Sequence, residues 1–79
     1  VDFREFGYTV TRAVIPAGKM REIDVYINGY DYYIKTNIDR EAGVTAEDGS
    51  RMIKYLEERE IVAQYVDIRV EGKAYYKQN

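Results

Sequence analysis

The chain has 79 residues, with 12 lysines and arginines against 14 aspartates and glutamates, which gives a formal net charge of −2. It contains no cysteine and no histidine, which excludes disulfides, thiolate nucleophiles, a Ser-His-Asp triad and the usual zinc sites. A chain of this mass buries about 60% of its unfolded surface. We therefore expect residues 1–79 to form one small α+β domain with a single core.

The first predicted strand covers residues 6–11, where apolar and small or polar residues alternate. A Pro-Ala-Gly-Lys sequence at 16–19 indicates a turn. Folding the chain back at that turn would set Arg12 opposite Ile23, on the face meant for the core. Such a position requires either that the arginine stem lies over the core edge with its head in water, or that a bulge shifts the register.

A β-hairpin is the strongest local prediction, over residues 23–34, where two β-prone runs flank Asn28 and Gly29. The Asn-Gly pair accepts the positive φ angles of a type I′ turn, which matches the twist of a two-residue hairpin. A slip of one residue would send every side chain to the other face, so the hydrophobic pattern favours one register. The residues expected on the core face are Ile23, Val25, Ile27, Tyr30, Tyr32 and Ile34.

The second half of the chain predicts one helix followed by two strands. Thr45 is a good helix N-cap, and an apolar stripe predicts a helix over residues 46–60. Alternation predicts a strand over 66–70 and a short final strand over 73–76, with a tight turn at 71–72. The order β-β-β-α-β-β predicts a two-layer α+β fold, with one helix packed on one face of a mostly antiparallel sheet.

The outer face of this sheet is the candidate binding surface. A two-residue hairpin pairs Asp24 with Tyr33 and Tyr26 with Asp31 there, and Lys35 follows on the same face. Tyrosine offers an apolar ring with a polar tip at low entropic cost and is enriched in interfaces. The alternative interpretation is an ordinary solvated sheet face, because tyrosine is also a good strand former.

Pairs of carboxylates are the remaining candidates for catalysis or for Mg²⁺ binding, at Asp24 with Asp31 and at Asp39 with Glu41. Acid–base hydrolysis needs a carboxyl group in an apolar pocket and a cleft for the substrate, and a sheet with one helix leaves little room for a cleft. The sequence contains no phosphate-binding glycine motif. We therefore expect no enzymatic activity, no catalytic residue, no metal site and no cofactor.

These patterns predict a non-enzymatic interaction module that acts as an inhibitor or adaptor, a class that includes the accessory proteins made by phages or plasmids. It would bind another protein through the Tyr/Asp-rich face or through an edge strand. An exposed edge at residues 75–77 would also allow a homodimer. The alternative function is binding of single-stranded or duplex nucleic acid by stacking on Tyr26 and Tyr33. Its basic residues would be Lys35, Arg12 and Arg21, but it is less favoured because two aspartates on the same face repel phosphate.

The apolar runs are two to three residues long, too short to span a bilayer. The first residues lack the charged region followed by an apolar region that a signal peptide has. We therefore expect no membrane contact and a cytoplasmic location, or the host cytoplasm if the protein is viral.

Overall fold

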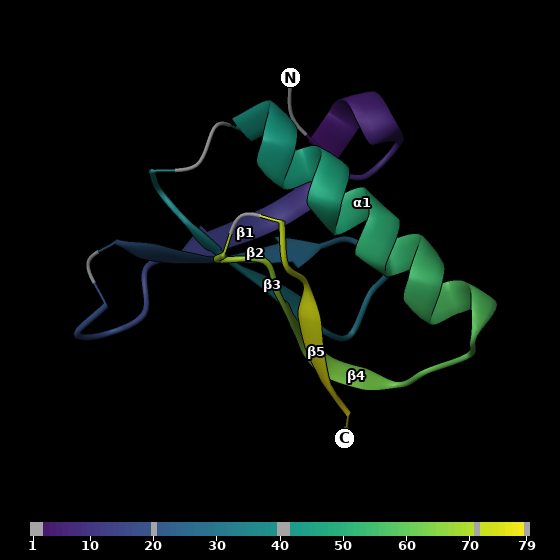
Figure 1. Ribbon diagram of the computed structural model, residues 1–79. Coiled ribbons are helices and arrows are strands. Elements are labelled where there is room, and N and C mark those ends of the chain that lie inside the picture. Colours follow the sequence, from purple (N-terminus) through teal and green to yellow (C-terminus); the bar gives the residue numbers. More distant parts are fainter. Residues whose placement is uncertain (1–2, 20, 40–41, 71, 79) are drawn as a thin grey trace.

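One long helix lies across one face of a five-stranded sheet (Figure 1). The computed structural model describes residues 3–19, 21–39, 42–70 and 72–78. The strands follow one another across the sheet in chain order, and the β3–β4 pair, which the helix connects, is parallel. The predicted two-layer α+β fold with the order β-β-β-α-β-β is confirmed. The elements are η1 (Phe3–Phe6, a 3-10 helix), β1 (Val10–Val14), β2 (Glu22–Ile27), β3 (Tyr33–Asn37), α1 (Ala42–Glu58), β4 (Ala63–Asp67) and β5 (Tyr75–Gln78).

The core lies between α1 and the central strands, where alternate strand residues point towards the helix. Ile34, Ile53 and Val66 are fully buried at its centre. The sorting predicted for the hairpin holds, because Val25, Ile27, Tyr32 and Ile34 all belong to this core. The remaining buried hydrophobic residues are Phe3, Ala46, Leu56, Ala63 and Ile68.

The N-terminal segment differs from the predicted strand over residues 6–11. Phe3 begins a short 3-10 helix, and Gly7, with a φ of 87°, turns the chain before β1 starts at Val10. The Tyr8 amide donates a hydrogen bond of 3.0 Å to the Phe3 carbonyl and closes this turn. The turn is explained by Phe3, because its buried ring packs against the helix. An extended strand over residues 6–11 has no such turn to bring Phe3 back to the helix.

A bulge resolves the predicted conflict at Arg12. Val10 lies opposite Ile27, but the register shifts by one residue before Arg12, which lies opposite Tyr26. The extra residue turns Arg12 to the face away from the helix. Of the two alternatives left open by the sequence, the structure therefore shows the bulge.

The hairpin between β2 and β3 has a longer loop than predicted. Tyr26 pairs with Tyr33 rather than with Asp31, and Asp24 pairs with Lys35 rather than with Tyr33. The shift is two residues, so the residues that stay paired in β2 and β3 keep their predicted faces, whereas Asp31 is left in the loop. The predicted pairs are wrong, whereas the predicted faces are confirmed.

The turn type explains part of this difference. Gly29 has a φ of 89°, but Asn28 does not take the positive φ that a type I′ turn requires. The Tyr30 amide donates to the Ile27 carbonyl at 3.2 Å, and with a positive φ at Gly29 alone this geometry is that of a type II turn. The longer loop lets Tyr32 enter the core and brings the Tyr30 hydroxyl within 2.5 Å of Glu57 on α1.

The helix begins earlier than predicted. It starts at Ala42, so Thr45 lies inside its first turns rather than at the N-cap. Thr45 is buried, and its hydroxyl has no hydrogen-bond partner among the described residues. The buried side of the helix therefore begins at Thr45 and Ala46, two turns before Ile53, and continues through Gly49 and Ser50.

The C-terminal end of α1 has the geometry of a Schellman motif. The Ile61 amide donates to the Leu56 carbonyl at 3.0 Å, and the Glu60 amide donates to the Glu57 carbonyl at 3.2 Å. Glu60 has a φ of 53°, in the left-handed region that normally favours glycine. The helix therefore ends at Glu58, two residues before the predicted end.

Replacing Glu60 by glycine is expected to raise the free energy of unfolding by about 0.5–1 kcal/mol. Glycine removes the steric penalty of the left-handed conformation and also an anion near the helix C-terminus, which outweighs the greater freedom of the unfolded glycine chain. Urea denaturation followed by circular dichroism measures the change. Glu58→Gly is the control, and it should destabilise because Glu58 keeps a helical conformation.

Both C-terminal strands are displaced relative to the prediction. β4 covers 63–67 instead of 66–70, and β5 covers 75–78 instead of 73–76. Pairing with β3 sets these limits, because Ile34 lies beside Val66 in a parallel register that the sequence pattern alone does not reveal. The predicted turn at 71–72 is described only at Gly72, which has a φ of 77°; residue 71 lies outside the described residues.

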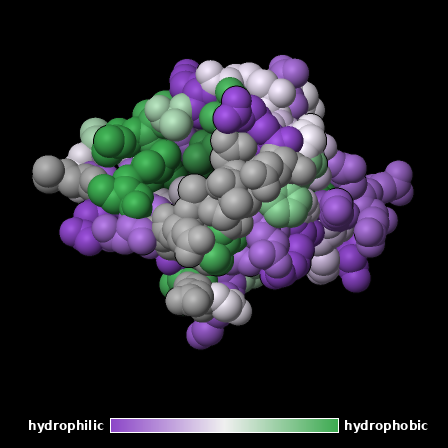
Figure 2. Space-filling model, turned by 90° about the horizontal axis from the view of Figure 1, so that it is seen from above, coloured by the Kyte–Doolittle hydropathy of each residue, from purple (hydrophilic) through white to green (hydrophobic). Residues whose placement is uncertain are grey.

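The helix leaves the β1 edge of its own face uncovered. Val10 is 40% exposed and Ile15 is 60% exposed, and the view from above the helix shows a hydrophobic area flanked by hydrophilic surface (Figure 2).

In the part of the chain that the structure describes, no helix is long and apolar enough to cross a membrane.

Candidate functional site

The sheet face away from α1 carries one row of side chains that crosses all five strands. Arg12 on β1 lies opposite Tyr26 on β2, and Tyr26 lies opposite Tyr33 on β3. Tyr33 lies beside Tyr65 on β4, which lies opposite Lys77 on β5. We call these five residues the tyrosine row. Three aromatic rings thus form the middle of the tyrosine row, and a cationic side chain lies at each end of it, on the two edge strands of the sheet.

The three rings of the tyrosine row are in contact. The ring centroids of Tyr26 and Tyr33 are 5.3 Å apart, and those of Tyr33 and Tyr65 are 5.7 Å apart, with interplanar angles of 32° and 33°. The guanidinium carbon of Arg12 lies 4.3 Å from the centroid of the Tyr26 ring, and Lys35 Nζ lies 4.7 Å from that of Tyr65. Neighbouring rings and cations therefore occupy the ring faces.

The hydroxyls of the three tyrosines are the polar groups of this row. Tyr26, Tyr33 and Tyr65 are half-buried, and their hydroxyls have no hydrogen-bond partner among the described residues. A tyrosine hydroxyl both donates and accepts a hydrogen bond. The row therefore combines apolar area with three unused polar groups, which is a composition typical of protein interfaces.

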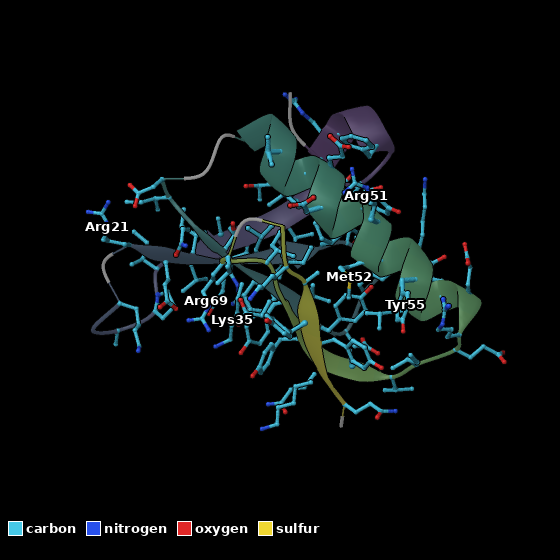
Figure 3. All side chains as sticks on the ribbon, in the orientation of Figure 1. Arg21, Lys35, Arg51, Met52, Tyr55 and Arg69 are labelled. Carbon is cyan, nitrogen blue, oxygen red and sulfur yellow. The ribbon has the colours of Figure 1, made fainter. Side chains whose placement is uncertain are left out.

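A second row of alternating charge runs beside the first. Asp24 on β2, Lys35 on β3 and Asp67 on β4 lie next to one another in the register. Lys35 Nζ lies over the tyrosine rings rather than within ion-pair distance of either described carboxylate. In the side-chain view, Lys35 and Arg69 lie on the sheet, whereas Met52 and Tyr55 lie on the helix (Figure 3).

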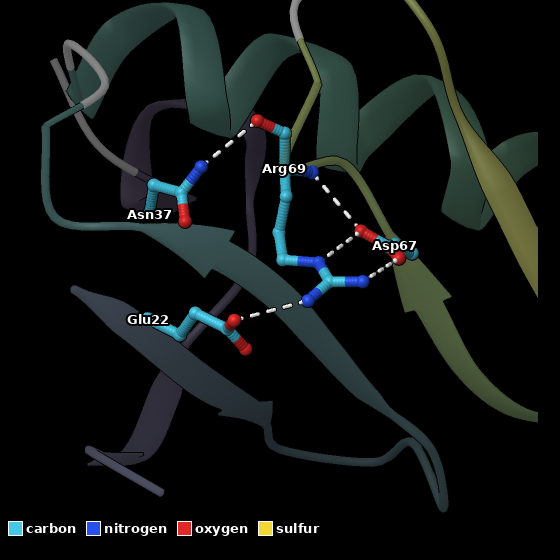
Figure 4. A network of polar contacts seen from close by, with 4 residues as sticks. All are labelled: Glu22, Asn37, Asp67 and Arg69. Carbon is cyan, nitrogen blue, oxygen red and sulfur yellow. Dashed lines mark hydrogen bonds and ion pairs between the residues drawn. The ribbon is translucent and has the colours of Figure 1, made fainter. Parts of the chain in front are cut away.

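Arg69 joins the carboxylates at one end of this face (Figure 4). Its Nε and Nη2 atoms donate to the two oxygens of Asp67 at 2.9 and 2.7 Å, and its Nη1 atom donates to Glu22 at 3.1 Å. Asn37 Nδ2 donates to the Arg69 carbonyl at 2.9 Å. This bidentate geometry is the strong form of an arginine–carboxylate contact, and it compensates both acids within the chain.

The two aspartates of the second row have opposite pKa shifts. Burial alone would raise the pKa of Asp67, but the hydrogen bonds and charge of Arg69 outweigh it, so the pKa of Asp67 is lowered from 3.8. Burial raises the pKa of Asp24 from 3.8, against the opposing charge of Lys35. One oxygen of Asp24 is buried without a hydrogen-bond partner among the described residues, so its charge is poorly compensated.

Asp67→Asn and Asp24→Asn are expected to change stability at pH 7 in opposite directions. The lowered pKa of Asp67 stabilises the fold above its unfolded value of 3.8, so Asp67→Asn should lose about 1 kcal/mol, a small figure because Arg69 is partly exposed. Because the pKa of Asp24 is raised in the folded protein, the fold loses stability as the pH rises from 3.8 to that raised pKa. Asp24→Asn should therefore be more stable than the wild type at pH 7. Both differences should shrink below about pH 3.8, where the carboxyl groups become protonated. Urea denaturation at pH 7 and at low pH measures them, and a shift of the same sign for both variants would contradict the assignment.

Four of the five sequence-predicted site residues lie together on this face, namely Asp24, Tyr26, Tyr33 and Lys35. Asp31 does not join them, because it lies exposed in the loop between β2 and β3. Tyr65 and Lys77 were not predicted as site residues, because the predicted fourth strand starts at residue 66 and the predicted fifth strand ends at residue 76. The alternation of Tyr65 with Asp67 was the available signal.

Other parts of the molecule offer little chemistry. The described residues contain no group of three or more acidic side chains that could hold a metal ion. An open pocket of about 190 Å³ lies between α1 and residues 72–74, but the arginine that lines it, Arg51, is already paired with Glu47 and Asp48. Asp39 pairs with Arg21 at 2.5 Å, and its predicted partner Glu41 lies outside the described residues.

Comparison of the chain with protein-family models, with curated proteins and with solved structures found no match.

Proposed function

We propose that the protein is a non-enzymatic interaction module that docks another protein on the tyrosine row. The observation that carries the proposal is a continuous row of three half-buried tyrosines with unpaired hydroxyls, on a sheet face that no described element covers. Tyrosine and arginine are among the residue types enriched at the energetic centre of protein interfaces. The row thus supplies apolar contact, hydrogen bonds and charge in one strip.

The ring geometry favours a protein partner over a nucleic acid. A base stacks on the open face of an aromatic ring. The faces of Tyr26 and Tyr65 are occupied by Arg12 and Lys35, and Tyr33 lies between its two neighbours. A partner that approaches ring edges and hydroxyls needs no such face.

Nucleic-acid binding remains the second candidate function because of one observation. Arg12, Lys35 and Lys77 form no ion pair with a described residue, so they are available to phosphates. The Asp24 and Asp67 carboxylates beside Lys35 oppose that use. Nucleic-acid binding through this face would have a steep salt dependence.

Site-specific photo-crosslinking tests the proposal. A benzophenone amino acid replaces Tyr65 in one variant and Lys54, an exposed residue of α1, in the control. In extract from the native host, the position-65 variant should form protein adducts that survive nuclease treatment, and the control should not form the same adducts. An adduct of two chains in the purified protein would identify the partner as a second copy. Adducts that nuclease removes, or identical adducts from both variants, would contradict the proposal.

A further inference from the structure

We propose that the tyrosine row recognises an acidic protein segment that crosses the strands, with an apolar stretch over the three rings and a carboxylate at each end. This inference rests on the proposed function and adds the chemistry of the partner to it. It follows from three features of the face: where its free charges lie, how long the row is, and what a second copy of the chain would bring to it.

The net charge left on this face is positive, although the whole chain is mildly acidic. Arg12, Lys35 and Lys77 outnumber Asp24, the one described carboxylate of the two rows that Arg69 does not hold. Glu22 and Asp67 are both held by Arg69. Arg12 and Lys77 are exposed and form no ion pair with a described residue. A carboxylate from a partner is therefore the complementary group at both ends of the row.

The length of the row sets the spacing of those carboxylates. Its residues lie on five neighbouring strands, so four strand spacings of about 4.8 Å separate Arg12 from Lys77, or about 19 Å. An extended segment covers this distance with about 6 residues, and a helix covers it with about 13 residues. A segment that follows the row lies across the strands, which distinguishes it from a strand added to an edge of the sheet.

A second copy of the chain does not fit the row. Two rows packed face to face would bring Arg12 against either Arg12 or Lys77 of the other copy, in parallel or antiparallel orientation. Both arrangements place cation against cation at each end, and like charges across an interface are unfavourable. The charge pattern therefore favours a different, acidic chain.

Selection from a displayed library of random peptides tests the inference. Peptides of about 18 residues are long enough for the helical case, and they are selected on the wild-type protein after removal of those that bind a Tyr26→Ala/Tyr33→Ala variant. We expect the selected peptides to be enriched in Asp or Glu at two positions separated by about 6 or about 13 residues, with apolar residues between them.

Charge reversal then tests the role of the two ends. Arg12→Glu/Lys77→Glu should weaken binding of a selected peptide by at least about tenfold. Lys54→Glu/Lys73→Glu is the matched control: it changes the net charge equally, it alters exposed residues outside the row, and it should bind the peptide as the wild type does. Circular dichroism of both variants shows whether they are folded.

The outcomes separate the two proposals. Tyrosine-dependent peptides without acidic enrichment, or with affinities that the charge reversal leaves unchanged, would overturn the inference and leave protein docking supported. Failure to select any tyrosine-dependent peptide would overturn the inference and the proposed function together. Binding of a single-stranded oligothymidylate that is lost in the Tyr26→Ala/Tyr33→Ala variant would overturn both in favour of a nucleic acid.

Discussion

Replacing Phe3 by alanine is expected to lower the free energy of unfolding by about 3 kcal/mol. The Phe3 ring is only 6% exposed and belongs to the main core. It lies so close to Gly49 of α1 that a Cβ atom at position 49 would stand 2.7 Å from its Cε1 atom and 2.9 Å from its Cζ atom. Urea denaturation followed by circular dichroism measures the loss. Phe6→Ala in the same 3-10 helix is the control and should lose less, because the Phe6 side chain is exposed.

A double-mutant cycle with Gly49 shows whether the contact is the cause. Gly49→Ala alone should destabilise by about 1 kcal/mol or more, because displacement of the Phe3 ring outweighs the gain in helix propensity. In the Phe3→Ala background the ring is gone, so Gly49→Ala should stabilise by about 1 kcal/mol. This change of sign is specific to the contact. Stabilisation in both backgrounds would mean that Phe3 does not pack on Gly49.

The sequence predicted the face of each hairpin residue better than its partner. Val25 and Ile34 point to the core and Tyr26 and Tyr33 point away from it, as the alternation required. A shift of two residues leaves this alternation unchanged, so the pattern could not distinguish a two-residue loop from the longer loop observed. The contact that accompanies the longer loop involves a residue distant in the sequence, because the Tyr30 hydroxyl donates a hydrogen bond to Glu57 on α1.

The tyrosine row shows the same limit. Tyr26 and Tyr33 were identified because a local hairpin joins them. Tyr65 reaches Tyr33 through the parallel pairing of β3 with β4, which the whole of α1 separates in the chain. Arg12 joins the row through a one-residue bulge, which the sequence left open as one of two alternatives. Local alternation thus predicts which residues share a face, and tertiary pairing decides which of them form a row.

The contacts within the row explain how its aromatic surface is accommodated without a partner. Arg12 lies over the ring of Tyr26 and Lys35 lies over that of Tyr65, so charged side chains cover part of the aromatic surface. A partner that brings carboxylates to the ends can pair with Arg12 and Lys77 while the rings keep their mutual contacts. Among the described residues, no cation lies within 5 Å of the centroid of the Tyr33 ring, since Lys35 Nζ is 5.9 Å from it. The centre of the row is therefore its most apolar point.

Tyr33→Ala is accordingly expected to weaken partner binding by about 2 kcal/mol or more, which is about 30-fold or more. Tyr33 contacts the rings on both sides of it, so its loss removes the centre of the row and the support of Tyr26 and Tyr65. Titration calorimetry with a selected peptide or with the crosslinked partner measures the change. Tyr55→Ala is the matched control, because Tyr55 is a partly exposed tyrosine of α1 in contact with Tyr76 and Arg59, away from the row.

Tyr33→Phe separates the ring from its hydroxyl. The ring contacts remain in this variant, so binding should weaken by no more than the contribution of one hydrogen bond, about 0.5–1.5 kcal/mol. If Tyr33→Ala binds as tightly as Tyr55→Ala while both variants stay folded, the centre of the tyrosine row is not the docking site. A loss in Tyr33→Phe as large as in Tyr33→Ala would instead assign the interaction to the hydroxyl, because the apolar area of the ring is retained.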